Sequence, residues 1–288
     1  MTEKKRWTVM PLVQASAEYL AKRSTSARLD AELLLANVLE TDRVGLYCRF
    51  DRPMAEDEVD RYRDLVRRRG AGEPVAYLIG EREFFGMRFA VDRRVLIPRP
   101  ETELLVERAL ALVPGGAELR VLDIGTGSGA IAVAIAARCT GVRVVAVDIS
   151  EDALVVAAAN AARHGVADRI EFARSDLFEH APGRFDLVVS NPPYIAPEAR
   201  DSLAADVAEF EPETALFAPD RGLYVIRRII QDAPARMSPG ASLLIEIGFD
   251  QADAVREIVR ASGLYDECVV HPDLAGRARV VEAKRWTR

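Results

Sequence analysis

The chain has 288 residues, of which 49% are hydrophobic and 29% are charged, and its formal net charge at pH 7 is −6. This composition is typical of a globular protein, and the length predicts two domains. The acidic balance disfavours a nucleic-acid-binding surface, and the sequence contains no run of about 18 apolar residues that would predict a membrane span.

We expect a cytoplasmic protein without a metal site. Cys48, Cys139 and Cys268 show neither CxxC nor Cys/His spacing, which predicts buried free thiols in a reducing compartment. The three histidines do not cluster with acidic or cysteine residues, so they predict no metal centre. The N-terminal residues lack the apolar core of a signal peptide.

The first part of the chain predicts a small helical domain, placed at residues 1–75. From about Thr8 to Gly70 the apolar residues recur with helical spacing, and no strand-like run occurs. This segment is too short for a cofactor-binding fold and contains no catalytic constellation. Its function is either structural or the docking of a substrate, and we assign it to substrate docking.

A β-hairpin is expected in a linker at residues 76–100. Glu83 to Val91 predicts two short strands with a turn near Gly86. Beyond the linker, Glu101 begins a helix that runs to Leu112, and the acidic residues of its first turn are favourable at the positive end of the helix dipole.

From Arg120 onward, predicted strands and helices alternate, which is the pattern of a parallel α/β sheet. The fold class is therefore α/β, and residues 101–288 are expected to form a Rossmann-like sheet that ends in an antiparallel hairpin. The expected strands are Arg120–Ile124, Val142–Val147, Arg169–Phe172, Phe185–Ser190, Ala241–Ile247, Glu267–Val270 and Arg277–Ala283, and the expected helices are Ala130–Ala137, Glu151–Ala162 and Gln251–Ser262.

The turn after the first of these strands predicts a cofactor loop. Gly125-Thr126-Gly127-Ser128-Gly129 connects a strand to a helix, and the next strand ends in Asp148, which is placed to accept hydrogen bonds from ribose hydroxyls. The spacing is not the G-x-G-x-x-G of dinucleotide sites. Asp123, directly before the loop, is unfavourable beside phosphate and favourable beside an ammonium group. S-adenosylmethionine is therefore favoured over a dinucleotide.

A second turn predicts the chemistry. Asn191-Pro192-Pro193-Tyr194 follows the strand Phe185–Ser190 at its carboxyl end, where open α/β folds bind ligands. The Asn191 carbonyl oxygen and a backbone carbonyl of the turn can accept the two N–H groups of a planar amine or amide. The ring of Tyr194 offers a face on which that plane can stack. We interpret the turn as a clamp for a methyl-accepting –NH2 group.

The chain as a whole resembles the bacterial protein-(glutamine-N5) methyltransferases that modify class-1 peptide chain release factors, the HemK/PrmC family. The glycine loop and the Asn-Pro-Pro-Tyr turn are shared with DNA-adenine and RNA-guanine methyltransferases, whereas the helical start and the run from Ile97 to Glu103 are much more specific. The matching segments are Asp30-Ala31-Glu32-Leu33-Leu34, Ile97-Pro98-Arg99-Pro100-Glu101-Thr102-Glu103, Asp123 to Gly129, Ser190-Asn191-Pro192-Pro193-Tyr194-Ile195 and Phe210-Glu211-Pro212-Glu213-Thr214-Ala215-Leu216.

This resemblance implies a class I S-adenosylmethionine-dependent enzyme that methylates N5 of the glutamine in the Gly-Gly-Gln motif of release factors. It implies that Gly125 to Gly129 hold the methionine end of the cofactor, that Asp148 binds the ribose, and that Asp176 and Leu177 flank the adenine. Relatives can carry a tryptophan where this chain has Leu177. Asn191 to Tyr194 would grip the glutamine, and Asn191 is also counted as a cofactor contact. Neither a membrane nor a nucleic-acid partner is expected.

Two other functions are kept as alternatives. A nucleic-acid methyltransferase acting on an exocyclic adenine or guanine amine would use the same turn on a flipped or unpaired base. A non-catalytic module that binds S-adenosylmethionine would retain the glycine loop, but it would not need the amide clamp at Asn191.

Overall fold

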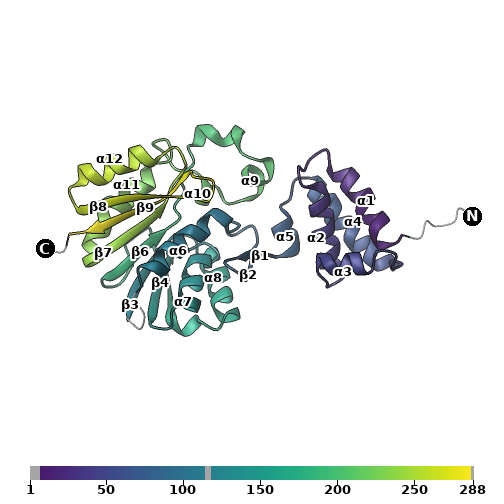
Figure 1. Ribbon diagram of the computed structural model, residues 1–288, viewed down its shortest axis with the longest axis horizontal. Helices are drawn as coiled ribbons and strands as arrows, with labels where there is room; N and C mark the ends of the chain where they lie inside the picture. The colour runs from purple at the N-terminus through teal and green to yellow at the C-terminus, as the bar shows by residue number, and fades with distance from the viewer. Residues whose placement is uncertain (1–6, 114–117, 287–288) are drawn as a thin grey trace, which may run out of the picture. The chain divides into compact units, whose positions relative to one another are not determined.

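The computed structural model describes residues 7–113 and 118–286. By its internal contacts the chain divides into two units (Figure 1). The first, here called the helical unit, contains the described residues up to Gly80 together with Ala204–Phe210, and the second, the sheet unit, contains Glu81–Leu203 and the described residues from Glu211. The sequence-based boundaries at residues 75 and 100 stay a prediction, and the assignment of Ala204–Phe210 to the helical unit was not foreseen.

The helical unit is built on one apolar core. Val9, Leu34, Leu35 and Tyr62 are fully buried in it, and they come from three different helices. The apolar spacing in the sequence therefore identified the faces that meet. The helices are α1 (Val9–Leu20), α2 (Ala27–Val38), α3 (Arg43–Cys48), α4 (Glu56–Gly70), α5 (Val75–Ile79) and α9 (Ala205–Phe210).

Arg69 at the end of α4 ties the later segment to this core. Its guanidinium is buried and donates to Asp30 on α2 at 2.7 Å and to Asp206 on α9 at 3.3 Å. It also donates to the carbonyl oxygens of Gly72 and Glu73. A buried guanidinium needs such partners because its desolvation is costly when it is unpaired. No local pattern in the sequence predicts a pair separated by 137 residues.

Glu32 on α2 is another buried charge of the helical unit. Its side chain is 1% exposed, and its carboxylate accepts hydrogen bonds from Arg28, Arg43 and Tyr47. Burial alone would raise the pKa of Glu32, but these three donors together lower it below its usual value of 4.5. The negative charge is therefore part of the folded structure.

The sheet unit contains a seven-stranded sheet with the strand order β5-β4-β3-β6-β7-β9-β8. The first five strands are parallel, and β9 and β8 run antiparallel, which confirms the expected Rossmann-like sheet and its terminal hairpin. The strands are β3 (Leu119–Ile124), β4 (Val142–Asp148), β5 (Ile170–Arg174), β6 (Phe185–Ser190), β7 (Met237–Glu246), β8 (Tyr265–Pro272) and β9 (Ala278–Arg285).

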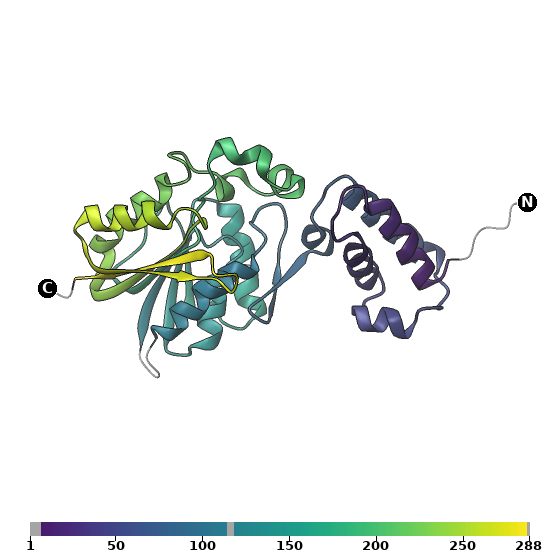
Figure 2. The same ribbon diagram turned by 45° about the horizontal axis from the view of Figure 1, so that its top comes forward.

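Helices cover both faces of the sheet (Figure 1, Figure 2). Because side chains alternate along a strand, Val121 faces one apolar core and Leu122 faces the other. The first core is covered by α6 (Glu103–Ala111), α7 (Ala130–Arg138) and α8 (Glu151–Arg163), and the second by α11 (Tyr224–Arg236) and α12 (Ala252–Ser262). The hairpin of β1 (Glu81–Phe84) and β2 (Met87–Ala90) packs with the first core.

Shorter helices connect these elements. Five single-turn or two-turn segments lie in the connections, among them η1, which the sequence had assigned to the start of an α-helix. The η1 turn places Thr102 in a buried position before α6 begins at Glu103. The segments are η1 (Pro100–Thr102), η2 (Ala167–Arg169), η3 (Pro197–Ser202) and α10 (Glu213–Leu216), together with α9 of the helical unit.

Two expectations need correction, and one helix was not predicted. Cys48 is exposed, and Cys139 and Cys268 are only partly buried, so the thiols are not core side chains. The strand β7 begins at Met237 rather than Ala241, because an irregularity in its pairing with β6 accommodates Gly240 at a positive φ. The helix α11 was missed, although Ile226, Ile229, Ile230 and Ala233 recur with helical spacing.

Within the two described ranges, no helix is long and apolar enough to span a membrane.

Glu32→Gln is expected to destabilise the protein by about 2–3 kcal/mol at pH 7. The change weakens charge-assisted hydrogen bonds, but Arg28 and Arg43 are half-exposed and can return to water, which limits the loss. Because the pKa of Glu32 is lowered on folding, its contribution is present above about pH 4.5 and is lost as the pH falls through the lowered value. Denaturant unfolding of both proteins should show a difference that narrows below about pH 4.

The matched control is Glu18→Gln on the exposed side of α1. Surface substitutions of this kind change stability by about 0.5 kcal/mol or less. An equal loss in the two variants, or a Glu32→Gln loss that is constant with pH, would contradict the assigned role of the buried carboxylate.

Candidate active site

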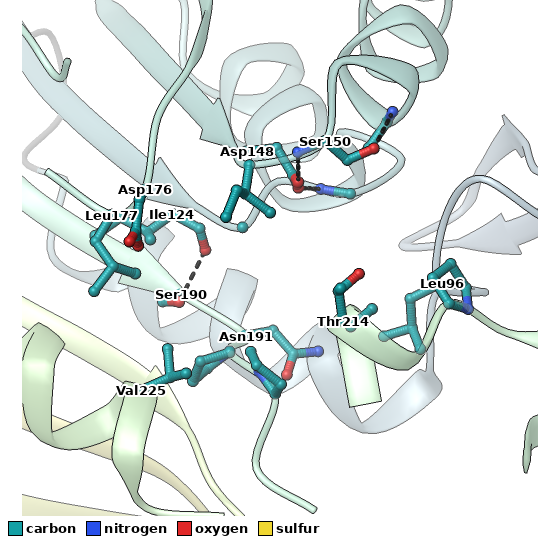
Figure 3. A pocket seen from close by; sticks show the side chains of 18 of the residues that line it. Leu96, Ile124, Asp148, Ser150, Asp176, Leu177, Ser190, Asn191, Thr214 and Val225 are labelled. Carbon is teal, nitrogen blue, oxygen red and sulfur yellow. Dashed lines mark hydrogen bonds between the residues drawn. The ribbon is translucent and has the colours of Figure 1, made fainter. Parts of the chain in front are cut away.

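A cavity of about 610 Å³ lies in the sheet unit, at the carboxyl ends of β3, β4 and β6. Its lining is mostly apolar, with a few polar groups, as in binding sites for small organic molecules. Figure 3 shows Asp148 and Ser150 on one side of the cavity and Asn191 and Val225 opposite, with Asp176 and Leu177 toward one end and Leu96 and Thr214 toward the other.

The glycine loop and Asp148 form one hydrogen-bonded unit at this cavity. Gly125 and Gly127 line it, both at positive φ. The Asp148 carboxylate accepts the Gly127 N–H at 2.9 Å and the Ser150 N–H at 3.0 Å. Burial raises the pKa of Asp148, and these two N–H groups oppose that shift. A carboxylate has about four acceptor sites, so Asp148 can still accept hydroxyl groups of a ligand.

Asp123 does not face the cavity, contrary to the reasoning from its position in the sequence. It is fully buried and accepts the hydroxyl of Thr126 at 2.7 Å. Burial raises the pKa of Asp123 to about 7. Asp123 and Thr126 therefore support the loop from the buried side, away from the cavity, and neither lines the cavity.

Ser128 and Gly129 are also supporting residues in this structure. The Ser128 carbonyl accepts a hydrogen bond from Asn160, whose side chain also bonds both backbone groups of Ala90 in β2. Gly129 begins α7 so close to α8 that an added Cβ would lie 3.0 Å from Ala157 Cβ. The loop is thus braced on its far side, and only Gly125 and Gly127 of its five residues line the cavity.

Asp176 and Leu177 line one end of the cavity, as expected for residues that flank a bound base. The Asp176 carboxylate is engaged by Arg228 of α11 at 3.1–3.2 Å. This ion pair was not foreseen, because the helix that carries Arg228 was missed. Leu177 has a positive φ of 50° and supplies apolar lining.

Asn191, Pro192 and Pro193 line the cavity directly after β6. The Asn191 amide donates through Nδ2 to the hydroxyl of Thr102 at 3.2 Å. This leaves Oδ1 as the amide atom that can accept hydrogen bonds from a ligand.

Tyr194 does not line the cavity. Its side chain is largely buried, and its hydroxyl donates to Glu246 at the end of β7 at 3.3 Å. Its backbone is held as well, because Gln251 Nε2 donates to the Tyr194 carbonyl oxygen at 3.0 Å. Gly222 sits against the same carbonyl with a φ of 82°. The turn is therefore fixed by residues that the sequence motif does not contain.

Several lining residues were missed by sequence reasoning. They lie on the segment after the hairpin, on or next to α10, and on α11. The sequence analysis recognised the segment that contains α10 but assigned it no place in the site, and the helical spacing of α11 is a usable signal. They include Leu96, Thr214, Phe217, Val225 and Ile229. Among the residues that the structure describes, no three His, Cys, Asp or Glu side chains are grouped as a metal site.

The chain matches two family models, the PrmC N-terminal domain over residues 12–80 and the methyltransferase small domain over residues 100–210. A release factor glutamine methyltransferase of Rhodopirellula baltica is 42% identical over 97% of this chain and 97% of its own length. A protein of the same name from Bordetella pertussis is 46% identical over 88% of this chain and 93% of its own length. The chain belongs to the release factor glutamine methyltransferase family.

Members of this family are S-adenosylmethionine-dependent enzymes, and S-adenosylmethionine is the cofactor of this chain. Among solved structures, the hMettl16 catalytic domain in complex with MAT2A 3'UTR hairpin 6 has a TM-score of 0.59 at 18% identity, covering 78% of this chain and 82% of that chain. This likeness confirms the methyltransferase fold and carries no information about substrate.

Gly222→Ala should reduce the methyl-transfer rate by about 10- to 100-fold. An added Cβ would lie 1.9 Å from the Tyr194 carbonyl oxygen, so the turn must move by more than an ångström. Displacements of that size at a reacting group cost up to about 100-fold in rate. Steady-state methylation kinetics and thermal unfolding of the variant would measure the effect.

Gly263→Ala is the matched control, since Gly263 also has a positive φ but an added Cβ there meets nothing within 4 Å. It carries a similar backbone strain of about 1–2 kcal/mol without disturbing the turn. If both variants lost activity equally, the effect would be one of stability, and the role assigned to Gly222 would be wrong.

Proposed function

We propose that this chain transfers a methyl group from S-adenosylmethionine to N5 of the glutamine in the Gly-Gly-Gln motif of class-1 peptide chain release factors. The observation that carries the proposal is the presentation of Asn191 Oδ1 at the cavity, with the amide nitrogen turned to Thr102. An acceptor at that position suits a substrate –NH2 group. The names of the relatives support a release factor as the substrate.

We propose that the cofactor lies along the cavity between the glycine loop and Leu177 (Figure 3). Gly125 and Gly127 would approach its methionine end, and Asp148 would accept the ribose hydroxyls. Asp176 and Leu177 would flank its adenine, and the Asp176–Arg228 ion pair would hold that wall in place. When bound, the cofactor supplies an electrophilic methyl group on a sulfonium. Thr126, Ser128 and Gly129 would support the loop without contacting the cofactor.

The residues of the turn would act on the substrate amide. An amide nitrogen is a weak nucleophile because its lone pair is delocalised into the carbonyl group. Asn191 Oδ1 and a backbone carbonyl of the turn would accept its two N–H groups and stabilise the positive charge that grows on nitrogen. Pro192 and Pro193 would fix the turn, and Tyr194 would support it from below. No strong base is needed, because the methylated cation loses a proton readily.

The helical unit is proposed to dock the release factor. A glutamine side chain alone offers too few contacts to select one protein, so a second surface is needed. Val44, Tyr47 and Phe50 are exposed within seven residues of the helical unit and offer apolar contact area. The acidic net charge supports a protein substrate rather than nucleic acid, and a cytoplasmic location is proposed because release factors act there.

Mass spectrometry of a recombinant release factor tests the function directly. Incubation with this protein and S-adenosylmethionine should add a single methyl group to the Gly-Gly-Gln peptide. Unstructured RNA and duplex DNA in parallel reactions with labelled cofactor should stay unlabelled. Labelled nucleic acid with unmodified release factor would instead establish the exocyclic-amine methyltransferase, and cofactor binding without turnover on any substrate would establish a binding module.

Asn191→Ala should slow turnover by raising its activation free energy by about 2–4 kcal/mol, the scale of a deleted transition-state hydrogen bond. The affinity for S-adenosylmethionine, measured by calorimetry, should change much less. Wild-type turnover in Asn191→Ala would rule out the amide clamp.

Asp148→Ala provides the opposite pattern in the same assays. It should weaken cofactor affinity by about 1.5–3 kcal/mol, because it removes hydrogen bonds to a charged group. Saturating cofactor should then restore much of the turnover. The two variants together separate cofactor binding from substrate activation.

A further inference from the structure

Behind the Asn-Pro-Pro-Tyr turn lies a buried polar group that the proposed mechanism does not use. Glu246 is the last residue of β7 and is 1% exposed. The pairing of Ser190 with Ile245 in the parallel sheet places Glu246 beside the start of the turn. Its carboxylate accepts a hydrogen bond from the hydroxyl of Tyr194 through Oε1, whereas Oε2 is buried without a hydrogen-bond partner among the described residues. The hydroxyl of Thr102 lies close enough to the carboxylate to lower the pKa of Glu246.

Thr102 therefore stands between Glu246 and Asn191. It is 4% exposed, and its hydroxyl accepts the Asn191 Nδ2–H at 3.2 Å. Tyr194 is thus bonded to the carboxylate directly, and Asn191 is bonded to Thr102, which neighbours the same carboxylate. A buried carboxylate is costly unless it is well satisfied, so an apolar side chain would be the simpler core residue at this position.

The carboxylate gives this chain of hydrogen bonds a direction. The two ends of an asparagine amide have the same shape, and a hydroxyl can either donate or accept, so Thr102 alone does not determine which end faces the ligand. An ionised carboxylate can only accept. A Thr102 hydroxyl that turns its single proton toward the unpartnered Oε2 of Glu246 leaves only its lone pairs for Asn191. In that arrangement the amide donates Nδ2–H to Thr102, as observed, and presents Oδ1 to the cavity.

We propose that Thr102 and Glu246 are positioning residues for methyl transfer, which hold Asn191 in the orientation that presents its carbonyl oxygen to the substrate amide. The inference rests on the proposed amide clamp. With the amide reversed, its N–H groups would face the N–H groups of the substrate, and the acceptor would be lost. Neither residue touches the substrate, so their effect is on turnover through Asn191.

The electrostatic surroundings make the ionisation of Glu246 dependent on pH near neutrality. Burial raises the pKa of Glu246 to about 7, and the charge of Glu101 acts in the same direction. Thr102, Arg279 of β9 and Tyr194 oppose that rise. A protonated Glu246 can donate to Thr102, which frees the threonine hydroxyl to donate to Asn191 Oδ1 and permits the reversed amide.

The first test compares Thr102→Val with Thr102→Ser, using recombinant release factor and saturating cofactor. Thr102→Val keeps the shape but removes the hydroxyl, and it should lower kcat by about 10- to 100-fold with little change in cofactor Kd. Thr102→Ser restores the hydroxyl and should stay within about threefold of wild type. Equal kcat losses in the two variants, or a Thr102→Val enzyme with wild-type kcat, would overturn the proposal.

Glu246→Gln carries the second test, which does not depend on the threonine variants. In the wild type, kcat should rise as the pH increases through about 7, because the ionised carboxylate enforces the productive amide orientation. The glutamine variant should have a lower kcat without this rise. A Glu246→Gln profile with the wild-type acidic limb would overturn the proposal, whatever its absolute rate.

Asn191→Ala, measured in the same reactions, separates this inference from the proposed function. An inactive Asn191→Ala variant together with a fully active Thr102→Val variant would support the amide clamp and contradict only the positioning role. A fully active Asn191→Ala variant would contradict the amide clamp itself. Methylation of the release factor by the wild type in every series shows that the substrate is correct.

Discussion

The register of three parallel strands is the constraint on which the site depends. Ile124 in β3 pairs with Val147 in β4 on one side and with Ser190 in β6 on the other. The next residue after each of these is Gly125, Asp148 or Asn191. Because parallel strands share one direction, the three groups leave the sheet at the same level and along the same edge. A shift of one strand by a single residue would turn its functional side chain to the other face.

Buried carboxylates support this edge from below. Asp123 holds the glycine loop through Thr126, and Glu246 lies behind the turn that follows β6. Both are fully or almost fully buried, and burial raises the pKa of each to about 7. Such groups add little to net stability, since their desolvation offsets the hydrogen bonds they make. What they provide is a fixed orientation for the neighbouring polar groups.

The helical unit uses buried charge in a different way. Arg69 bonds to Asp30 and to Asp206, so the short helix Ala205–Phe210 belongs to this unit although the chain on both sides of it belongs to the sheet unit. The following residue, Glu211, is buried in the sheet unit, where it accepts hydrogen bonds from the Ile97 N–H and the Arg99 side chain. The family-specific run from Ile97 to Glu103 therefore has a structural role, because two of its residues bind Glu211, the residue that follows α9.

The sequence by itself determined the sheet, its terminal hairpin and the residues at the strand ends, because continuous apolar runs, glycine turns and prolines are local signals. It also identified Asp148 and Asn191 as candidates, since both follow directly from strand ends. It did not place Tyr194 against Glu246, Asp176 against Arg228, or Asp206 against Arg69. The partners are 52 residues apart in the first two pairs and 137 residues apart in the third. Only the folded chain brings such residues together. The end of the Asn191 amide that bonds to Thr102 is likewise not encoded by a local pattern, because Thr102 lies on another element 89 residues away.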